Sequence, residues 1–298
     1  MGKRNLALAA ATCVSIIYGV TFTIAKDVMP AYIGAFGFIF LRVGGSAVLF
    51  WLAWLLVPKE KIDTADWLRI AAAALFGVAL NMLTFFKGLS LTSPISAAVI
   101  MVTTPIIVLV LSALIIGEKM QKRKAFGILL GLVGTAILIL YGKSAESAPD
   151  ATLGNLLVLI NAVSYGLYLI LVKKLMHKYN AFSFVKWIYT LGFLMVIPFG
   201  WTEFNAIDWP SMPADIYLKT LFVVAISTFL TYLLNLLSMK ELSPSTVAVF
   251  IYLQPLFATV FAIGLGKDGL TVVKVISAAL IFAGVYLVTA KNPASDKQ

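Results

Sequence analysis

The sequence predicts an all-α polytopic membrane protein, in which ten transmembrane helices form two inverted five-helix repeats around a central cavity. The first observation is composition: 61% of the residues are hydrophobic, 12% are charged, and the mean hydropathy is +0.99. About a quarter of the residues in soluble domains are charged, so this chain belongs in a bilayer. The other two observations are an internal repeat and the lengths of the apolar runs.

The internal repeat pairs two stretches of the same length, SPISAAVIMVTTP at residues 93–105 and SPSTVAVFIYLQP at residues 243–255. The second and last residues of each stretch are prolines, and both pairs of prolines are separated by 150 residues without a gap. A period of half the chain indicates two copies of one domain, because solenoid repeats have periods of about 20 to 50 residues. We expect a first repeat (1–142), a linker (143–152), a second repeat (153–291) and a polar C-terminal tail (292–298).

Ten apolar runs each have close to the roughly 20 residues that cross the hydrocarbon core of a bilayer. We expect spans at residues 6–25, 33–57, 65–86, 94–116, 124–141, 153–172, 181–201, 216–237, 244–264 and 271–290. Prolines and the stretch 143–150 separate these runs. The first run resembles a signal peptide at its start, but it has the length of a full span, so we expect an uncleaved helix.

The basic residues give the orientation. The net charge is +10, which in a soluble protein would suggest a nucleic-acid partner. Here most Lys and Arg residues lie in connections on one side of the predicted spans, which is positive-inside bias. We therefore expect no nucleic-acid partner, an integral protein of the bacterial cytoplasmic (inner) membrane, and both termini in the cytoplasm. Each repeat has an odd number of spans, so the second repeat enters the membrane inverted.

Two prolines divide matching spans. A proline inside a helix removes one hydrogen bond and clashes with the carbonyl four residues earlier, which belongs to Met101 for Pro105 and to Ile251 for Pro255. Paired interruptions in corresponding positions of two halves point to a transporter binding site, so we expect Pro105 and Pro255 to be hinges. The alternative is a pair of kinks that only improve packing.

Polar side chains follow one face of several spans at helical spacing. Stripes of this kind lie in the third, sixth and eighth spans, shorter ones lie in the first span, and two polar residues directly precede the paired prolines. The candidate substrate-binding residues, besides Arg42, are Tyr18, Asn81, Thr84, Thr104, Asn161, Tyr165, Tyr168, Thr231, Asn235, Tyr252 and Gln254. Polar groups inside a membrane are costly and often functional. The alternative is that they form hydrogen bonds between helices and only hold the bundle together.

Arg42 is the strongest candidate for ligand recognition. It lies well inside the second span, and no Asp or Glu lies in the interior of any predicted span. A substrate carboxylate or phosphate could supply the missing negative charge, since the planar guanidinium suits bidentate contact with either. Lys186 is only about six residues into its span, so we expect it to extend to the membrane interface.

Catalytic and energy-coupling signals are absent from the sequence. No connection is long enough for a soluble catalytic domain, and there is no GxxxxGK[ST] phosphate loop, so ATP-driven transport by this chain alone is not expected. A membrane-embedded enzyme would need His, Cys, Asp or Glu residues that converge in the spans. Apart from Cys13 the interiors of the predicted spans lack them. We expect no catalytic residue, no metal and no cofactor.

Two long segments resemble the EamA type of the drug/metabolite transporter superfamily. They are FFKGLSLTSPISAAVIMVTTPIIVLVLSALIIGEKMQKRKAFGILLGLVGTAIL and LSMKELSPSTVAVFIYLQPLFATVFAIGLGKDGLTVVKVISAALIFAGVYLV. Each has a mid-helix proline, and the first has the GE pair at the helix end and glycines in the next helix. The resemblance implies ten helices in inverted repeats, a central cavity, and alternating-access transport of small metabolites, often amino-acid efflux. The second segment departs from the family pattern, because Lys267 and Asp268 replace GE and Ser277 replaces a glycine.

Two further features concern assembly and gating. The GILLG run at 127–131, followed by Gly134, predicts close helix packing, either within the chain or at a homodimer contact. Glu118 ends the fourth span beside several lysines, which predicts an interfacial ion-pair cluster or a cytoplasmic latch.

The function that these patterns favour is a secondary membrane transporter that exports a small polar metabolite, with an amino acid as the first candidate. A nucleotide-sugar or other phosphorylated-metabolite exchanger is the alternative within transport, and it should need more than one buried cation. A membrane-embedded enzyme and a scaffold are the alternatives from other classes. The sequence does not determine the coupling ion.

Overall fold

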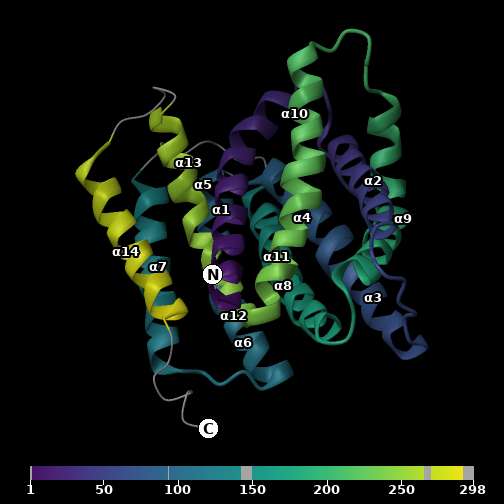
Figure 1. The fold of residues 1–298 in the computed structure, drawn as a ribbon. Helices are drawn as coiled ribbons and strands as arrows, with labels where there is room; N and C mark the ends of the chain where they lie inside the picture. The colour runs from purple at the N-terminus through teal and green to yellow at the C-terminus, as the bar shows by residue number, and fades with distance from the viewer. Residues whose placement is uncertain (1, 93, 142–149, 265–269, 291–298) are drawn as a thin grey trace.

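The computed structural model describes residues 2–92, 94–141, 150–264 and 270–290, and its ordered elements in these ranges are helical (Figure 1). Most of the expected linker, the C-terminal tail, and the Lys267–Asp268 pair lie outside the described residues. The predicted domain limits therefore stay a prediction.

The first repeat contains seven α-helices and two short segments of other helical type. Its elements are α1 (Lys3–Val28), α2 (Ala35–Trp54), a 3₁₀ turn (Thr64–Asp66), α3 (Trp67–Ala74), a π segment (Leu75–Ala79), α4 (Leu80–Leu91), α5 (Pro94–Met101), α6 (Thr104–Ile116) and α7 (Lys122–Leu140).

The second repeat has the same order. Its elements are α8 (Ala151–Met176), α9 (Ala181–Asn205), α10 (Ala214–Val224), a π segment (Ala225–Leu230), α11 (Thr231–Glu241), α12 (Pro244–Val249), a 3₁₀ segment (Phe250–Tyr252), α13 (Leu253–Gly264) and α14 (Val272–Thr289). Within the described residues, nine helical stretches are long and apolar enough to cross a membrane. The span predicted at 94–116 is divided into α5 and α6, and α6 alone is shorter than a full span.

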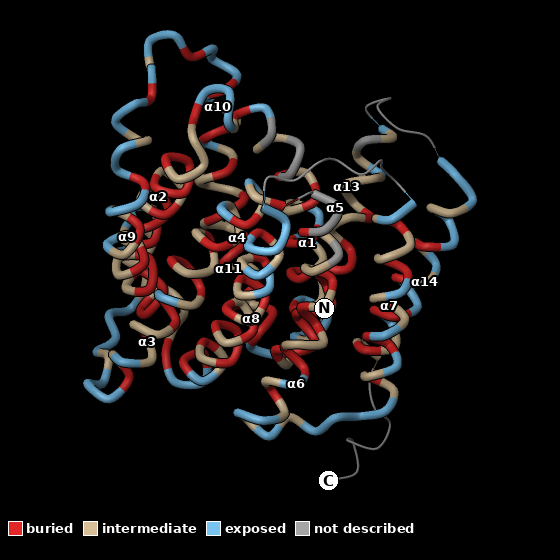
Figure 2. Tube along the Cα trace, turned by 180° about the vertical axis from the view of Figure 1, so that it is seen from behind, coloured by how far each residue is buried: buried red, intermediate tan, exposed pale blue. Residues whose placement is uncertain are grey.

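Helices of one repeat pack mainly against helices of the other. Helix α1 lies against α11 and α13, and α8, its counterpart, lies against α4 and α6. The remaining pairs are α2 with α9 and α7 with α14. Both views place α7 and α14 along one edge of the molecule and α2 and α9 along the other, with α1, α8 and α11 between them (Figures 1 and 2). The two repeats thus form one interlocked bundle, whose buried residues lie where these helices meet.

One end of the bundle, here called the basic end, carries the start of α1 and the ends of α8 and α14. Arg4 donates from its guanidinium to the Thr289 carbonyl at 2.6 Å, and Lys173 donates to the Leu242 carbonyl at 3.1 Å. Both carbonyls lie at or just beyond a helix C-terminus, where the helix dipole favours a positive charge. Because α1 starts and α8 ends at this end, the two repeats run in opposite directions.

The contact between α7 and α14 explains the glycine run. A Cβ atom on Gly127 would lie 2.8 Å from the Gly284 carbonyl oxygen, and one on Gly284 would lie 2.6 Å from the Gly127 carbonyl oxygen. Ser277, which departs from the family glycine, is fully buried opposite Gly134. Small residues therefore let the two backbones approach, and the run is used inside the chain.

This contact predicts a stability effect. Gly284→Leu should lower the free energy of unfolding by about 1–3 kcal/mol, because a side chain there overlaps the α7 backbone. Ala283→Leu, on the exposed face of the same helix, should change it by less than about 0.5 kcal/mol. Thermal unfolding in detergent measures both, and equal melting temperatures for the two variants would contradict the packing.

Candidate functional site

Arg42 lies on α2, seven residues after Ala35, or about 10 Å along the helix axis at 1.5 Å per residue. Its side chain is half-buried. The guanidinium Nε donates to the Thr228 hydroxyl at 3.1 Å, and its central carbon lies 5.9 Å from the centre of the Phe86 ring. No carboxylate of the described residues lies within 4.0 Å of it. The two terminal nitrogens of Arg42 have no hydrogen-bond partner in this part of the chain.

A π segment holds Thr228 in this position. The Thr228 hydroxyl donates to the Val223 carbonyl, five residues earlier, at 2.7 Å, and it accepts the bond from Arg42. Next to it, Ser46 on α2 donates to the Val224 carbonyl at 3.1 Å. The bonds from Arg42 and Ser46 both hold α2 against the same irregular turn. The π segment widens the helix locally, so the carbonyls of Val223 and Val224 are free to accept hydrogen bonds from side chains. These bonds hold the face of α2 that carries Arg42.

The first repeat has a matching π segment, which begins at Leu75, 150 residues before Ala225. Its carbonyls accept hydrogen bonds at 2.6 Å from Ser164 of α8 and from Tyr232 of α11. One of these carbonyls belongs to Gly77, where an added Cβ atom would lie 2.1 Å from the Tyr168 ring. Single-turn π segments inside α-helices are frequent at functional sites. Nothing in the hydropathy pattern signals either of them.

Aromatic rings extend the site beside Arg42. The Tyr18 hydroxyl lies 3.3 Å from the Thr231 hydroxyl, and Thr231 is one helical turn after Thr228. Ring centres are 5.8 Å apart for Tyr168 and Tyr232, 6.3 Å for Tyr165 and Tyr168, and 4.9 Å for Tyr189 and Tyr232. The structure thus brings Tyr18, Tyr165, Tyr168 and Thr231 into one interior region. The polar stripes miss Tyr189 and Tyr232.

Two candidate asparagines bind each other's helix. Asn161 donates from its side-chain amide to the Asn81 carbonyl at 2.7 Å, and Asn81 donates to the Asn161 carbonyl at 3.4 Å. Thr84 donates to the Leu80 carbonyl at 2.7 Å, within its own helix. These bonds join α4 to α8 or stay inside α4, which is the use expected of polar groups that hold helices together.

The helices that carry the paired prolines are both interrupted. The Met101 carbonyl, which Pro105 leaves without its helical partner, accepts a hydrogen bond from the Thr104 hydroxyl at 2.6 Å. In the second repeat the interruption is a 3₁₀ segment, and Ser15 of α1 donates to the Phe250 carbonyl at 2.8 Å. A hydroxyl therefore bonds the carbonyl that Pro105 frees at the first break. At the second break the carbonyl that Pro255 frees, that of Ile251, accepts from the backbone N–H of Leu253.

Three candidates lie apart from Arg42 or make no polar contact. The Tyr252 ring packs against α7, where a Cβ atom on Gly131 would lie 2.4 Å from it, and the Tyr252 hydroxyl is buried without a partner in the described part of the chain. The backbone carbonyl oxygen of Gln254 would lie 3.0 Å from a Cβ atom on Gly19 of α1, so the two helices are in close contact there. Asn235 is 7% exposed and forms no side-chain hydrogen bond with other described residues.

A polar cluster at the basic end joins the two repeats. The left-handed residue Gly117, with a φ of 66°, ends α6 and directs the chain to Glu118. The Glu118 carboxylate accepts hydrogen bonds from Lys124 and from Ser245, and Lys124 also donates to the Ser243 hydroxyl at 2.8 Å. The partner predicted for Glu118 was a neighbouring loop lysine, and the structure shows the buried Lys124 of α7 in that role.

The charge of Glu118 depends on these partners. Burial alone would raise the pKa of the Glu118 carboxyl, but the Lys124 ammonium and the hydrogen bonds from Lys124 and Ser245 outweigh it, so this pKa lies below its ordinary value of 4.5. A carboxyl whose pKa is lower in the folded state contributes stability above the unfolded-state pKa, and this contribution is lost as the pH falls through the folded-state value.

We therefore expect Glu118→Gln to lower the melting temperature at pH 7, because Lys124 then stays buried without its carboxylate. The difference from the unmodified protein should begin to shrink below about pH 4.5, where Glu118 of the unfolded chain becomes protonated, and should be lost as the pH falls through the lower folded-state pKa. Glu241→Gln, at an exposed carboxylate of the same end, is the control and should show no such convergence. A difference for Glu118→Gln that stays constant from pH 7 to pH 3 would contradict the ion pair.

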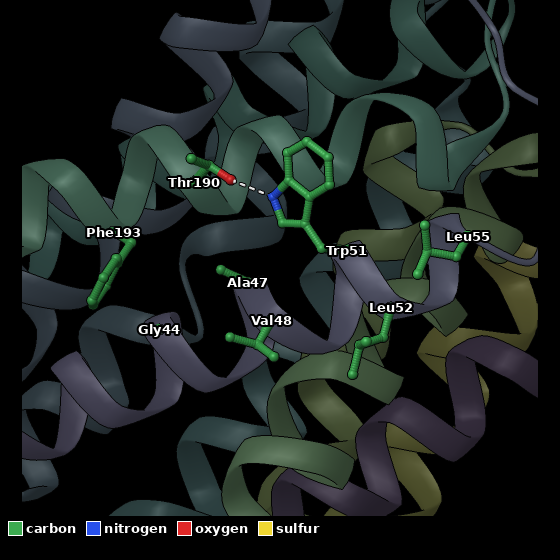
Figure 3. Close-up of a pocket in the computed structure, with 8 residues that line it drawn as sticks. All are labelled: Gly44, Ala47, Val48, Trp51, Leu52, Leu55, Thr190 and Phe193. Carbon is green, nitrogen blue, oxygen red and sulfur yellow. Dashed lines mark hydrogen bonds between the residues drawn. The ribbon is translucent and has the colours of Figure 1, made fainter.

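The hollow in Figure 3 does not coincide with the Arg42 region. It lies between α2 and α9, and its lining is apolar apart from Trp51 and Thr190, which form a hydrogen bond of 2.9 Å. Its α2 residues, Gly44 to Leu55, lie on the face opposite Arg42 at 100° per residue. This hollow therefore does not include Arg42, and the candidate site for a polar substrate stays the region of Arg42 and the tyrosines.

Comparison with known proteins identifies relatives over nearly the whole chain. The profile of the EamA-like transporter family matches residues 5–140 and 152–290. An uncharacterized transporter of Archaeoglobus fulgidus is 26% identical over 271 residues, which is 90% of each chain. The uncharacterized transporter YyaM of Bacillus subtilis is 24% identical over 277 residues, covering 91% of this chain and 89% of its own. A crystal structure with 18% identity superposes with a TM-score of 0.77 over 96% of this chain and 98% of its own.

Proposed function

Because the chain belongs to the EamA-like transporter family, and so is a membrane transporter, we propose that it is a secondary carrier that exports a small polar metabolite by alternating access. An amino acid is the substrate that its site suits best. In this proposal the basic end faces the cytoplasm of a bacterial cell, and the protein lies in the inner membrane. Positive-inside bias supports that orientation.

The observation that carries the proposal is the guanidinium of Arg42. It is half-buried, it uses only Nε for a hydrogen bond to Thr228, and its terminal nitrogens have no carboxylate partner among the described residues. Two parallel N–H donors in one plane fit a carboxylate in a bidentate contact. The tyrosine rings close to this region would contact the apolar part of the same substrate.

The count of cations favours a carboxylate over a phosphate. A phosphorylated substrate carries more negative charge, and its site should hold several cations. Among the described residues the guanidinium of Arg42 has one hydrogen-bond partner, the Thr228 hydroxyl, and the Phe86 ring beside it. Lys124 is neutralised by Glu118 at the basic end, and Lys186 lies among the tryptophan rings of α2 and α9. A zwitterion with a single carboxylate matches one guanidinium.

Alternating access also needs parts that change shape. The interrupted helices α5–α6 and α12–α13 supply flexible points at Pro105 and Pro255, and the cluster of Glu118, Lys124 and Ser245 joins the repeats at the basic end. We propose that the cluster closes the cytoplasmic side and separates when the carrier opens inward.

A counterflow screen of amino acids in proteoliposomes tests the proposed substrate class. With any substrate found, Arg42→Lys should weaken apparent affinity, and Arg42→Gln should weaken it by about tenfold to a hundredfold, since a hydrogen bond to a charged group contributes about 1.5–3 kcal/mol. Lys retains the charge and loses the planar fork. Lys87→Gln, at an exposed position on α4, is the control.

A loss of folded yield without a loss of affinity would contradict the proposed role of Arg42. If Arg42→Gln lowers only the folded yield, and the apparent affinity per folded carrier stays unchanged, then Arg42 is a packing residue and the proposed site is wrong.

The hinges lead to a separate kinetic prediction. Pro105→Ala and Pro255→Ala should slow exchange several-fold more than they weaken equilibrium binding, because a stiffer gate changes the barriers between states. Pro198→Ala, which removes a proline from inside α9 that has no counterpart in the other repeat, is the matched control. Equal exchange rates for all three variants would leave Pro105 and Pro255 as structural kinks.

A further inference from the structure

The side chain of Lys186, which we expect to extend to the membrane interface, is enclosed by tryptophan rings. It lies near the start of α9 and is only 4% exposed. Its ammonium nitrogen lies 3.0 Å from the centre of the Trp54 ring, 4.2 Å from that of Trp51 and 5.4 Å from that of Trp187. Indole rings attract a cation but do not neutralise its charge. Within the described residues, Lys186 has no carboxylate within 4.0 Å and no side-chain hydrogen bond.

A second cation shares the same aromatic ring. The ammonium of Lys59 lies 5.8 Å from the centre of Trp54, and it too has no carboxylate within 4.0 Å in the described part of the chain. The nearest acidic neighbour in sequence, Glu60, accepts a hydrogen bond from the Asn180 backbone at 2.7 Å and so is engaged elsewhere. Two unneutralised ammonium groups therefore face one tryptophan at the basic end of the bundle.

An apolar groove lies next to Lys186, because the Trp51 ring beside its ammonium also lines the groove. It is a hollow of about 440 Å³ between α2 and α9, and its lining residues are Gly44, Ala47, Val48, Trp51, Leu52, Leu55, Thr190 and Phe193 (Figure 3). Trp51 belongs both to the groove and to the rings around Lys186. Gly44 forms the end of the groove that is farthest from Lys186. It lacks a side chain, and a Cβ atom there would lie 2.8 Å from the Phe193 ring.

The length of the groove matches one leaflet. From Gly44 to Leu55 the α2 axis advances about 16 Å at 1.5 Å per residue, and half of a hydrocarbon core is about 15 Å thick. Val48, Leu52 and Leu55 expose 60%, 55% and 64% of their surfaces along it. The groove is therefore open to the side of the bundle, where acyl chains lie, and it ends among the tryptophans and lysines expected at headgroup level.

We propose that this groove is a binding site for one anionic phospholipid of the leaflet at the basic end. One acyl chain lies along α2 from Leu55 to Gly44, and the headgroup phosphate pairs with Lys186 and Lys59. Charge complementarity selects the occupant: a zwitterionic lipid would bring its own cation to two ammonium groups, while an anionic lipid neutralises them. Basic pockets between helices on the cytoplasmic side of membranes bind anionic headgroups in this way.

The experiment measures lipid binding to the full chain in detergent by native mass spectrometry and by the melting temperature. The probes are phosphatidylglycerol, phosphatidylcholine with the same acyl chains, and soluble glycerol phosphate. We expect phosphatidylglycerol to bind at least tenfold tighter than phosphatidylcholine and to raise the melting temperature, with no effect of glycerol phosphate.

Four variants locate the site. Lys186→Gln and Lys59→Gln should each weaken phosphatidylglycerol binding by about tenfold, the loss of one charged contact, and Lys186→Arg should retain most of it. Val48→Trp should block the groove and weaken binding without removing a charge. Lys240→Gln, at an exposed basic-end position, is the control. Since Lys59 and Val48 are exposed, their variants keep the test decisive if Lys186→Gln does not fold.

Three outcomes would overturn the proposal. Equal binding of the two lipids would mean an unselective lipid surface. An equal effect of glycerol phosphate would mean a phosphate site that needs no acyl chain. Undiminished phosphatidylglycerol binding by the Lys59 and Val48 variants would place the lipid elsewhere.

Discussion

The structure depends on one constraint: inside a bilayer, a backbone carbonyl without its helical partner must receive a hydrogen bond from another part of the protein. Side chains meet this constraint at several irregular segments among the described residues. Ser164 and Tyr232 serve the first π segment, and Thr104 and Ser15 serve the two interrupted helices. Three of these four donors come from a different helix, so the irregular backbone also fastens the repeats together.

The same constraint leads to the site. Widening of the second π segment places Thr228 where it accepts from Arg42, and its counterpart in the first repeat places Gly77 against Tyr168 and Tyr232. Twofold-related irregularities thus surround a centre that is not itself symmetric, because the position equivalent to Arg42 is Gly192. A single guanidinium in a duplicated frame is consistent with the proposed substrate that carries one carboxylate. At the basic end, Glu118 and Lys124 neutralise each other, whereas Arg42 has no carboxylate within 4.0 Å among the described residues.

More of the fold than of the candidate site could be predicted from the sequence. The 150-residue offset predicted both helix interruptions, because proline sterics are a local constraint. Run lengths predicted ten spans; nine helical stretches of the described residues are long and apolar enough, and the run at 94–116 is divided. The stripes marked Tyr18 and Thr231 as candidates on separate spans, and the two hydroxyls lie 3.3 Å apart; their role in binding stays a prediction. The stripes could not indicate the direction of Tyr252, because a 3₁₀ segment has 3.0 residues per turn and changes which side chains share a face. The π segments have no signature in hydropathy, and the tryptophan ring around Lys186 joins residues of α2 and α9 that are far apart in the sequence.

The most direct measurement of the central claim is a thermodynamic cycle on substrate binding. An amino acid that the carrier binds and its methyl ester, which lacks the carboxylate charge, are each titrated against the unmodified protein and against Arg42→Gln. A direct contact between the guanidinium and the carboxylate predicts a coupling energy of about 1.5–3 kcal/mol. A coupling energy of zero, with the amino acid and the ester weakened equally by the substitution, would contradict the claim that Arg42 binds the charge of the substrate.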